Sequence, residues 1–400
     1  MNHIEEKNHF FNFLTGVFFI LLLFNVFTVT DFPIRDIAFT TMEWTRYLAF
    51  IIIFYVVIKQ EWSKNLKPFY SGFTVFTGMY IIIHIVHQNT GDNSALILIL
   101  LNILYVFALA HLRWKDKQFV IFAFISVLFI SVLFIHWLYA GAPMLKFYSL
   151  IRNPNITGVF FSCLLFFPIV AFTYVRKWGR VILAIGIIMA SILVYVTSAR
   201  AAMLLIITVI LSRLILLYSS KIFSWLFYGV IIYNGLFVLV YGLLARSSYF
   251  KELNKWSIEN FGKNFFSGRQ HVWGPAIDYG KDALLLGHKI GIVPKDFIEG
   301  TVYVHSHNQF LQIFLESGLV GLLSFLLLLF GIWRVYQKGI DSPTVQWSAC
   351  FFLGIMIYQS VEISLFFNMS SIGLLHWFII SIGMSGVLSY KRKNGSFSNL

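Results

Sequence analysis

Long apolar runs alternate with short polar connections along nearly the whole chain. A helix needs about 20 mostly apolar residues to cross the hydrocarbon core of a bilayer. The runs therefore predict an all-α polytopic membrane protein with about twelve transmembrane helices. They cover residues 10–30, 42–58, 70–87, 95–112, 119–140, 156–175, 181–197, 200–219, 222–245, 308–333, 346–367 and 369–390. The breaks near residues 198 and 368 are short enough to be re-entrant turns instead of true boundaries.

One long hydrophilic stretch, residues 246–304, interrupts this pattern. We therefore divide the chain into transmembrane helices 1–9 over residues 1–245, a loop over 246–304, transmembrane helices 10–12 over 305–390 and a polar tail over 391–400. No internal repeat is evident, and the spans themselves are nearly free of charge.

The basic residues predict the orientation. If the N-terminus lies inside, every inner connection carries Lys or Arg, whereas the short outer connections carry few. The inner residues are Lys59, Lys64, Lys67, Arg113, Lys115, Lys117, Arg176, Lys177, Arg180, Arg213, Lys221, Arg334, Lys338 and the tail residues Lys391, Arg392 and Lys393. The positive-inside rule then places both termini in the cytoplasm and the 246–304 loop outside.

Composition supports this interpretation and excludes others. Hydrophobic residues make up 58% of the 400 positions and charged residues only 12%. A soluble protein of this length could not bury so much apolar surface. The net charge of +13 is mostly a topology signal, because no basic soluble face is present, and we expect no nucleic-acid partner. The two cysteines form no disulfide or metal pattern.

Two histidines and an asparagine stand where the tenth run begins, in HSHNQ from His305. Ser306 followed three residues later by Gln309 is a capping-box pattern, which predicts Ser306 as the N-cap and His307 as the first helical residue. The positive end of that helix would favour a neutral imidazole, the form that accepts a proton. Gly318 and Gly321, three apart, predict a small face for close helix contact. We see no third ligand for a metal near these histidines.

Two arginines are placed at the same outer surface as His307. Arg200 falls between two apolar runs, where an arginine either anchors to lipid phosphate or faces a partner. Arg269 follows Gly268 in the loop; on its own it would be a solvated charge. The segment NPNITG, which contains Asn155, predicts a turn followed by a helix start.

These residues match a family pattern. His307, Asn308, Gly318 and Gly321 resemble the signature of O-antigen ligases, which is a histidine, a small polar residue, nine residues, a glycine, two residues and a small residue. The stretch SGRQHVWGPAIDYGKDALLLGHKIG resembles the outer-loop pattern of the same superfamily, and TSARAA and NPNITG resemble two other recurrent segments. The chain departs from the pattern at His288, where glycine is usual.

The resemblance implies a membrane-embedded glycosyltransferase of the GT-C type in the inner membrane of a Gram-negative bacterium, with its active site facing the periplasm. It implies that His307 is the general base and that Arg200 and Arg269 bind the pyrophosphate of an undecaprenyl-linked O-antigen donor. The acceptor would be lipid A–core, and membrane lipids surround both substrates. His305, Asn308, Asn155, Gly318 and Gly321 are further candidate contacts.

The chemistry suits these residue types. A lipid pyrophosphate is a good leaving group and needs charge stabilisation, which arginine forks supply. A sugar hydroxyl is a weak nucleophile that a neutral histidine can deprotonate. A single displacement would invert the anomeric centre, and we expect no metal and no cofactor. The roles of Asp278, Glu316 and Glu362 stay open at this point.

Two alternatives remain. An O-antigen polymerase would use the same chemistry on a carrier-linked acceptor, and a protein O-oligosaccharyltransferase ranks behind it. A lipid or polysaccharide transporter belongs to another class, but transporters place polar sites near the midplane, whereas this chain concentrates them at the outer face.

Overall fold

The structure is a computed structural model. It describes residues 15–30, 33–59, 62–87, 92–147, 149, 151, 153–245, 247–262, 264–265, 268–366 and 370–395. Within these ranges the protein is all-α, with one isolated bridge between Thr30 and Ile151 and no β-strand. The break predicted near residue 368 lies outside the described residues.

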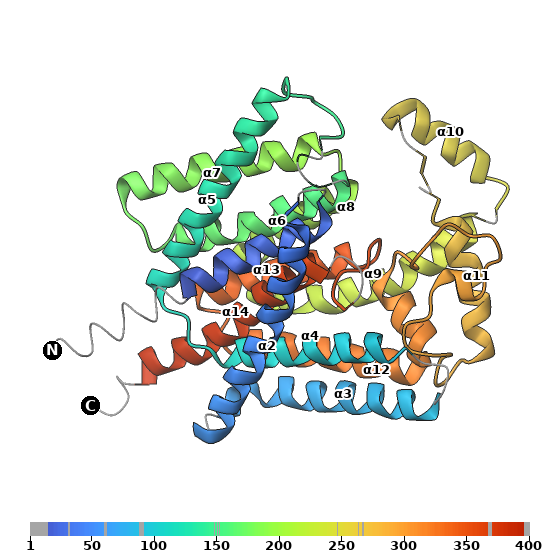
Figure 1. The fold of residues 1–400 in the computed structure, drawn as a ribbon, viewed down its shortest axis with the longest axis horizontal. Helices are drawn as coiled ribbons and strands as arrows, with labels where there is room; N and C mark the ends of the chain where they lie inside the picture. Colours follow the sequence, from blue (N-terminus) through green and yellow to red (C-terminus); the bar gives the residue numbers. More distant parts are fainter. Residues whose placement is uncertain are drawn as a thin grey trace.

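The helices follow the apolar runs closely (Figure 1). An apolar helix over Thr15–Val29 comes first and ends in the short 3₁₀ helix η1. The elements are η1 (Asn25–Val29), α2 (Arg35–Lys59), η2 (Lys64–Leu66), α3 (Lys67–Val86), α4 (Asn93–His111), α5 (Asp116–Tyr139), α6 (Pro154–Ala171), α7 (Lys177–Val196), α8 (Arg200–Tyr218), α9 (Ser220–Ala245), α10 (Phe250–Phe261), α11 (Gln270–Asp282), η3 (Pro294–Asp296), α12 (Gln309–Gln337), α13 (Pro343–Tyr358) and α14 (Ser370–Gly395).

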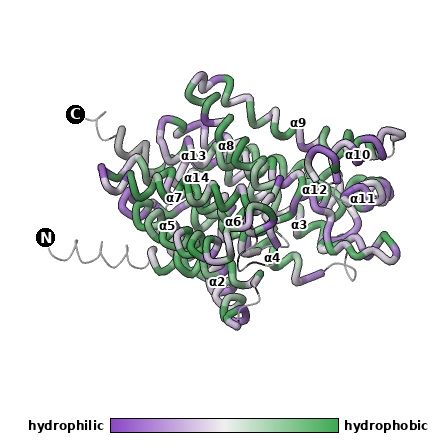
Figure 2. The backbone as a smooth tube through the Cα atoms, turned by 90° about the horizontal axis from the view of Figure 1, so that it is seen from above, coloured by the Kyte–Doolittle hydropathy of each residue, from purple (hydrophilic) through white to green (hydrophobic). Residues whose placement is uncertain are grey.

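The protein is a multi-pass membrane protein. Among the described residues, nine helices are long and apolar enough to cross a bilayer, and Thr15–Val29 and α13 are shorter apolar helices. Each of the twelve expected spans therefore overlaps a helix, but within the described part of the chain only nine of those helices meet the length and hydropathy of a span. Figure 2 shows apolar helices between polar ends, with α10 and α11 at one polar end.

The predicted boundary near residue 198 is confirmed. α7 and α8 are separate helices, each long enough to span, and they are joined by a turn at residues 197–199. The turn is not re-entrant. NPNITG also forms the helix start that its sequence predicts: Pro154 is the first residue of α6, and the Asn153 side chain caps the helix by accepting from Asn155 N–H at 2.8 Å.

The predicted span over 346–367 is wrong in its second half, because α13 ends at Tyr358 and residues 359–366 are not helical. The segment is nonetheless almost entirely buried. Its apolar residues gave it the hydropathy of a span, although they pack inside the protein as irregular backbone. Non-helical backbone at membrane depth is tolerated only where protein or a cavity satisfies its polar groups.

Side chains and backbone at the start of α12 satisfy those groups. Gln309 N–H donates to Gln359 O at 2.9 Å, and Asn308 Nδ2 donates to Ser360 O at 2.7 Å. The start of α12 and the broken segment are thus held together, far apart in sequence but adjacent in space.

The loop after α9 packs as a small second core. Trp273 of α11 is fully buried among Val272, Tyr241 and Leu315, and its indole N–H donates to Ser306 O at 2.7 Å. α11 is thereby fixed to the residue that precedes His307. Figure 1 shows α10 and α11 together at the end of the bundle where α12 begins.

Candidate active site

His307 does not lie in the helix that follows it. The N-cap of α12 is Asn308, whose side chain accepts from Leu311 N–H at 2.8 Å. The predicted Ser306 cap is therefore wrong; the Ser306 hydroxyl donates to Asn308 O at 3.0 Å instead. Asn308 is the better cap because its amide also binds the broken segment, which a serine could not do at the same time.

The His307 backbone is left-handed, with φ of 52°. This conformation is uncommon for residues other than glycine, and such strain collects at functional sites. His307 precedes the N-cap, so it lies outside the first turn of α12. The predicted effect of the helix dipole on His307 therefore has no support in this geometry, and the neutral imidazole stays a prediction.

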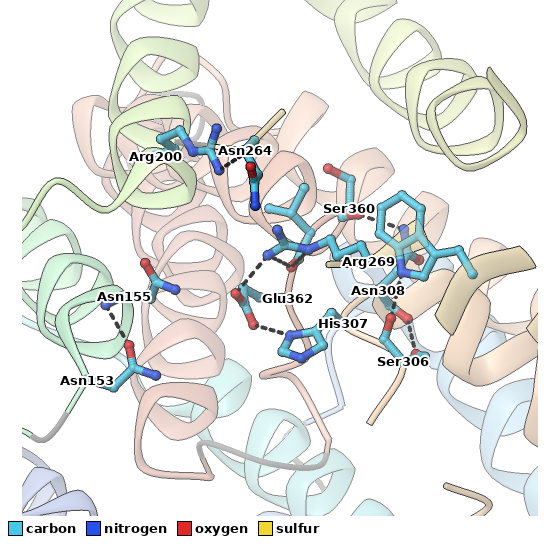
Figure 3. Close-up of polar contacts among 12 residues, drawn as sticks. Asn153, Asn155, Arg200, Asn264, Arg269, Ser306, His307, Asn308, Ser360 and Glu362 are labelled. Atoms are coloured by element: carbon cyan, nitrogen blue, oxygen red, sulfur yellow. Dashed lines mark hydrogen bonds and ion pairs between the residues drawn. The ribbon is translucent and has the colours of Figure 1, made fainter. Parts of the chain in front are cut away.

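The partner of His307 is Glu362. His307 Nδ1 lies 3.2 Å from Glu362 Oε2, and the carboxylate side chain is only 5% exposed (Figure 3). An Nδ1–H that donates to a carboxylate leaves the lone pair on Nε2, the nitrogen that can accept a proton. The pair has the base-and-orienting-group arrangement found around activated nucleophiles.

Arg269 binds the same short segment. Its Nη2 lies 3.1 Å from Glu362 Oε1, and both Nε and Nη2 donate to Val361 O, at 3.2 and 2.7 Å. Figure 3 shows Glu362 between Arg269 and His307. One carboxylate therefore fixes both groups, and the broken segment after α13 is the structural reason that they converge.

Electrostatics in this cluster favour an ionised Glu362. Burial alone would raise the pKa of its carboxyl group, but the hydrogen bond from His307 and the charge of Arg269 outweigh burial and hold the pKa below its ordinary value. Burial, reinforced by the nearby His307, lowers the pKa of His305 to about 4. The His305 and His307 rings lie 4.0 Å apart, so His305 is a neutral neighbour of His307 near neutral pH.

Arg200 is the first residue of α8, and its Nη2 donates to Asn264 O at 3.3 Å. α6 approaches this turn closely at Gly158, where an added Cβ atom would lie 2.6 Å from Ala199 Cβ. Only glycine fits so close an approach without displacing the turn. The segments NPNITG and TSARAA are therefore packed together, which brings Asn155 to the same side as Arg200.

A cavity of about 370 Å³ joins these groups. It is lined by Asn155, Ser198, Arg200, Ala201, Leu204, Phe237, Tyr241, Phe265, Arg269, Tyr303, His307, Val361 and Glu362. Four residues singled out in the sequence, from four separate segments, thus meet at one concave site. Two cations, a base and a carboxylate around a pocket that also has aromatic and aliphatic walls can hold an anion beside a hydroxyl group.

The other candidates, His305, Asn308, Gly318 and Gly321, do not line this cavity. Asn308 is buried and connects α12 to Ser360. Gly318 has φ of 62° and sits at a kink in α12, against the backbone of Leu285 and Gly287. Its expected helix contact is wrong, since it contacts a loop. Gly321 does face a helix, with Ile83 of α3 at 3.5 Å from an added Cβ.

The residues whose roles the sequence left undecided, apart from Glu362, do not line the cavity either. His288 stacks on Tyr279 with ring centroids 3.8 Å apart and holds the loop in place. Glu316 is buried and accepts from Tyr80 and Gln312. Asp278 pairs with Lys281 on the surface. Among the described residues, no three His, Cys, Asp or Glu side chains could share a metal ion.

Glu362 is the site residue that sequence reasoning missed. Its one signal was a carboxylate inside an otherwise apolar run, where an ionisable group is costly and marks function by default. The expected span over 346–367 concealed that signal, because it placed Glu362 near the end of a helix instead of in a buried turn.

The sequence was compared with models of known protein families and with curated proteins. Residues 184–326 match the family model described as O-antigen ligase, a segment from α7 into α12 that contains Arg200, Arg269 and His307. Glu362 and Asn155 lie outside the matched segment. No curated protein matches the chain. The chain is therefore a multi-pass membrane protein in which residues 184–326 match the O-antigen ligase family.

Proposed function

We propose that the protein transfers O-antigen from undecaprenyl pyrophosphate to lipid A–core on the periplasmic face of a Gram-negative inner membrane. The observation that carries the proposal is the meeting of Arg200, Arg269 and His307 at one cavity, in a chain with an O-antigen ligase domain. The family match alone does not identify the acceptor. The charged groups around the cavity support the transfer chemistry.

The two arginines are assigned to the donor pyrophosphate. The contacts of Arg269 with Val361 O and Glu362 fix the plane of its guanidinium group at the cavity wall. Its remaining N–H donors and those of Arg200 can bind phosphate oxygens, and a guanidinium binds phosphate through two parallel hydrogen bonds where lysine offers a point charge. As the sugar–phosphate bond breaks, these charges stabilise the leaving pyrophosphate.

His307 is assigned to the acceptor. Its Nε2 takes the proton of the acceptor hydroxyl while the hydroxyl oxygen forms a bond to the anomeric carbon of the donor. The bond between that carbon and the phosphate oxygen breaks in the same step, and the lipid pyrophosphate leaves. Glu362 stabilises the imidazolium that forms and holds the ring in place. General-base catalysis of this kind contributes roughly 10²–10⁴-fold. One displacement inverts the anomeric configuration, and no step of it requires a metal.

An O-antigen polymerase would use the same residues on a carrier-linked acceptor. The test is complementation of a strain that lacks its own ligase, with wild type or His307→Ala at equal membrane abundance, read as lipopolysaccharide on a silver-stained gel. A ladder on lipid A–core with wild type and none with His307→Ala supports the proposal.

Two other results would redirect it. If wild type gives no ladder on core but lengthens the carrier-linked glycan in a polymerase-deficient strain, the protein is a polymerase. If His307→Ala gives the same ladder as wild type, the assignment of the base is wrong.

A further inference from the structure

The cavity has an aromatic component that the transfer chemistry does not use. Phe237 and Tyr241 of α9, Phe265 of the loop and Tyr303 line it beside the charged groups. Three of these rings are engaged with one another. Tyr241 packs on Trp273 at 4.7 Å and lies parallel to Phe265 at 6.3 Å, and Phe237 contacts Tyr241 at 5.5 Å.

Tyr303 is placed differently. Its ring centroid lies 6.3 Å from that of His307, with the two planes at 88°. At the other end of the side chain, the hydroxyl donates to Gly268 O at 3.2 Å, in the residue before Arg269. Tyr303 therefore extends from the candidate base to the turn that carries the candidate phosphate ligand, and its ring is held at both ends.

A sugar acceptor needs such a surface. The donor is anchored by its pyrophosphate, whereas the reacting hydroxyl of the acceptor belongs to a neutral part of a glycan. A pyranose ring presents C–H groups on one face, which pack on the electron-rich face of an aromatic ring, while its hydroxyl groups point outward from the rim. A sugar stacked on a ring beside His307 thus directs a rim hydroxyl toward the imidazole.

We propose that Tyr303 is the platform for the acceptor sugar, a pyranose whose hydroxyl is deprotonated by His307. This assignment rests on the proposed function and deepens it, because it names the surface that orients the acceptor. The competing explanation is that Tyr303 only supports the turn at Gly268 and Arg269. That role depends on the hydroxyl, whereas stacking depends on the ring.

Two substitutions separate the roles. Tyr303→Phe keeps the ring and loses the bond to Gly268 O, and Tyr303→Leu loses the aromatic face. Transfer is measured with purified protein, varying lipid A–core at saturating donor and then the donor at saturating lipid A–core. Tyr249→Leu is the matched control, since Tyr249 is 63% exposed and does not line the cavity.

The proposal predicts that Tyr303→Leu raises the KM for lipid A–core by roughly three- to ten-fold, the scale expected for one lost stacking contact. The KM for the donor should stay within about two-fold, and Tyr249→Leu should behave like wild type. Tyr303→Phe keeps the aromatic face, so its KM for lipid A–core should rise less than that of Tyr303→Leu. Elution of each variant as a single species on size exclusion confirms that it is folded.

Three results would overturn the platform. Equal losses in Tyr303→Phe and Tyr303→Leu assign the residue to the support of the Arg269 turn. A rise in the donor KM alone assigns it to the donor sugar, and unchanged constants remove it from sugar binding. If wild type transfers no glycan, the proposed function fails. The role of Tyr303 is then tested separately, by direct binding of lipid A–core to wild type and to Tyr303→Leu in detergent. Equal affinities of the two proteins would overturn the platform.

Discussion

Glu362 accepts hydrogen bonds from a histidine and from an arginine at the same time, although it is almost completely buried. Leaving a buried charge without its partners is costly, so the three side chains are expected to act as a unit. The cluster explains why His307 can be oriented without belonging to a helix. Its position also makes Glu362 the most informative residue to substitute after His307.

Glu362→Gln should lower the transfer rate roughly 10²-fold or more, without loss of folded protein. The amide is isosteric, but it cannot stabilise the imidazolium, and its N–H₂ group can donate to Nδ1 and so select the wrong tautomer. The measurement is the rate with purified protein, with the exposed Glu252→Gln as the control. A rate equal to that of wild type would show that Glu362 has no part in the reaction.

The lowered pKa of His305 predicts a dependence of stability on pH. Between about pH 6.5 and 4 the unfolded chain protonates this histidine while the folded protein keeps it neutral, so its contribution to stability is present above pH 6.5 and is lost as the pH falls through that window. Charged or titratable neighbours in this region are His307, Glu362 and Arg269.

His305→Gln should therefore flatten the decline of the melting temperature across that window. The measurement is thermal unfolding in detergent from pH 7.5 to 4 for wild type and variant. Parallel curves for the two proteins would contradict the buried neutral state of His305.

At the scale of elements, the site depends on two irregularities, the broken segment after α13 and the kink in α12. At the kink, Gly318 has a positive φ and touches the loop at Leu285 and Gly287, while Leu319 N–H and Val320 N–H donate to Leu284 O and Leu285 O. The helix gives up its own hydrogen bonds here and the loop replaces them. The loop and α12 are therefore locked together beyond the site.

Gly318→Ala should destabilise the protein. The Gly318 backbone at φ 62° and ψ −162° lies in a region essentially restricted to glycine, which costs other residues about 1–3 kcal/mol, and the alanine Cβ would collide with the loop backbone. Gly229→Ala in α9 is the control, since nothing lies within 4 Å of an added Cβ there, and helix propensity makes it neutral or stabilising by up to about 1 kcal/mol. Melting temperatures in detergent compare the two; equal values would refute a role for the kink.

The helices could be predicted from the sequence because hydropathy dominates helix placement in a bilayer. The helix boundaries at the site could not. Asn308 and Ser306 are both good caps, and the choice between them is made by Ser360, fifty-two positions away. The Ile363–Phe366 stretch is as apolar as a span, so its hydropathy does not reveal that its backbone is irregular.

The candidate site divides in the same way. His307, Arg200 and Arg269 could be predicted because they belong to recognisable local motifs. The pairing of Glu362 with His307 and Arg269 joins residues 55 and 93 positions apart, and only the packing of α13 against the rest of the bundle sets it. Tyr303 likewise could not be singled out from the sequence, because its proposed role depends on its position between His307 and Gly268 in the folded protein.

At the scale of the whole molecule, the two ends of the helix bundle carry different groups. The cavity, α10 and α11 lie where α12 begins, and the basic connections predicted to be cytoplasmic include the chain after the end of α12 (Figure 1). The part of α12 after the kink, residues 319–337, has 19 residues, which corresponds to about 28 Å of helix, close to the thickness of the hydrocarbon core. Its two ends are therefore expected at opposite membrane faces.

Cysteine labelling tests that orientation. Cys163 and Cys350 are buried, so a single introduced cysteine can be read against a low background. In spheroplasts, Lys281→Cys should react with a membrane-impermeant maleimide, and Lys117→Cys should react only after permeabilisation. The reverse pattern would place the cavity on the cytoplasmic side and refute the predicted periplasmic orientation.

The central claim is that His307 acts as a base on a hydroxyl while Arg200 and Arg269 hold a lipid pyrophosphate in the same cavity. Its most direct test is glycan transfer by the purified protein, with undecaprenyl-pyrophosphate-linked O-antigen and lipid A–core both supplied in detergent. The account predicts covalent transfer with inversion by wild type and a loss of roughly 10²-fold or more in His307→Ala. Undiminished transfer by His307→Ala would contradict the mechanism, and no transfer by wild type, with the glycolipid crossing a membrane unchanged, would favour a transporter.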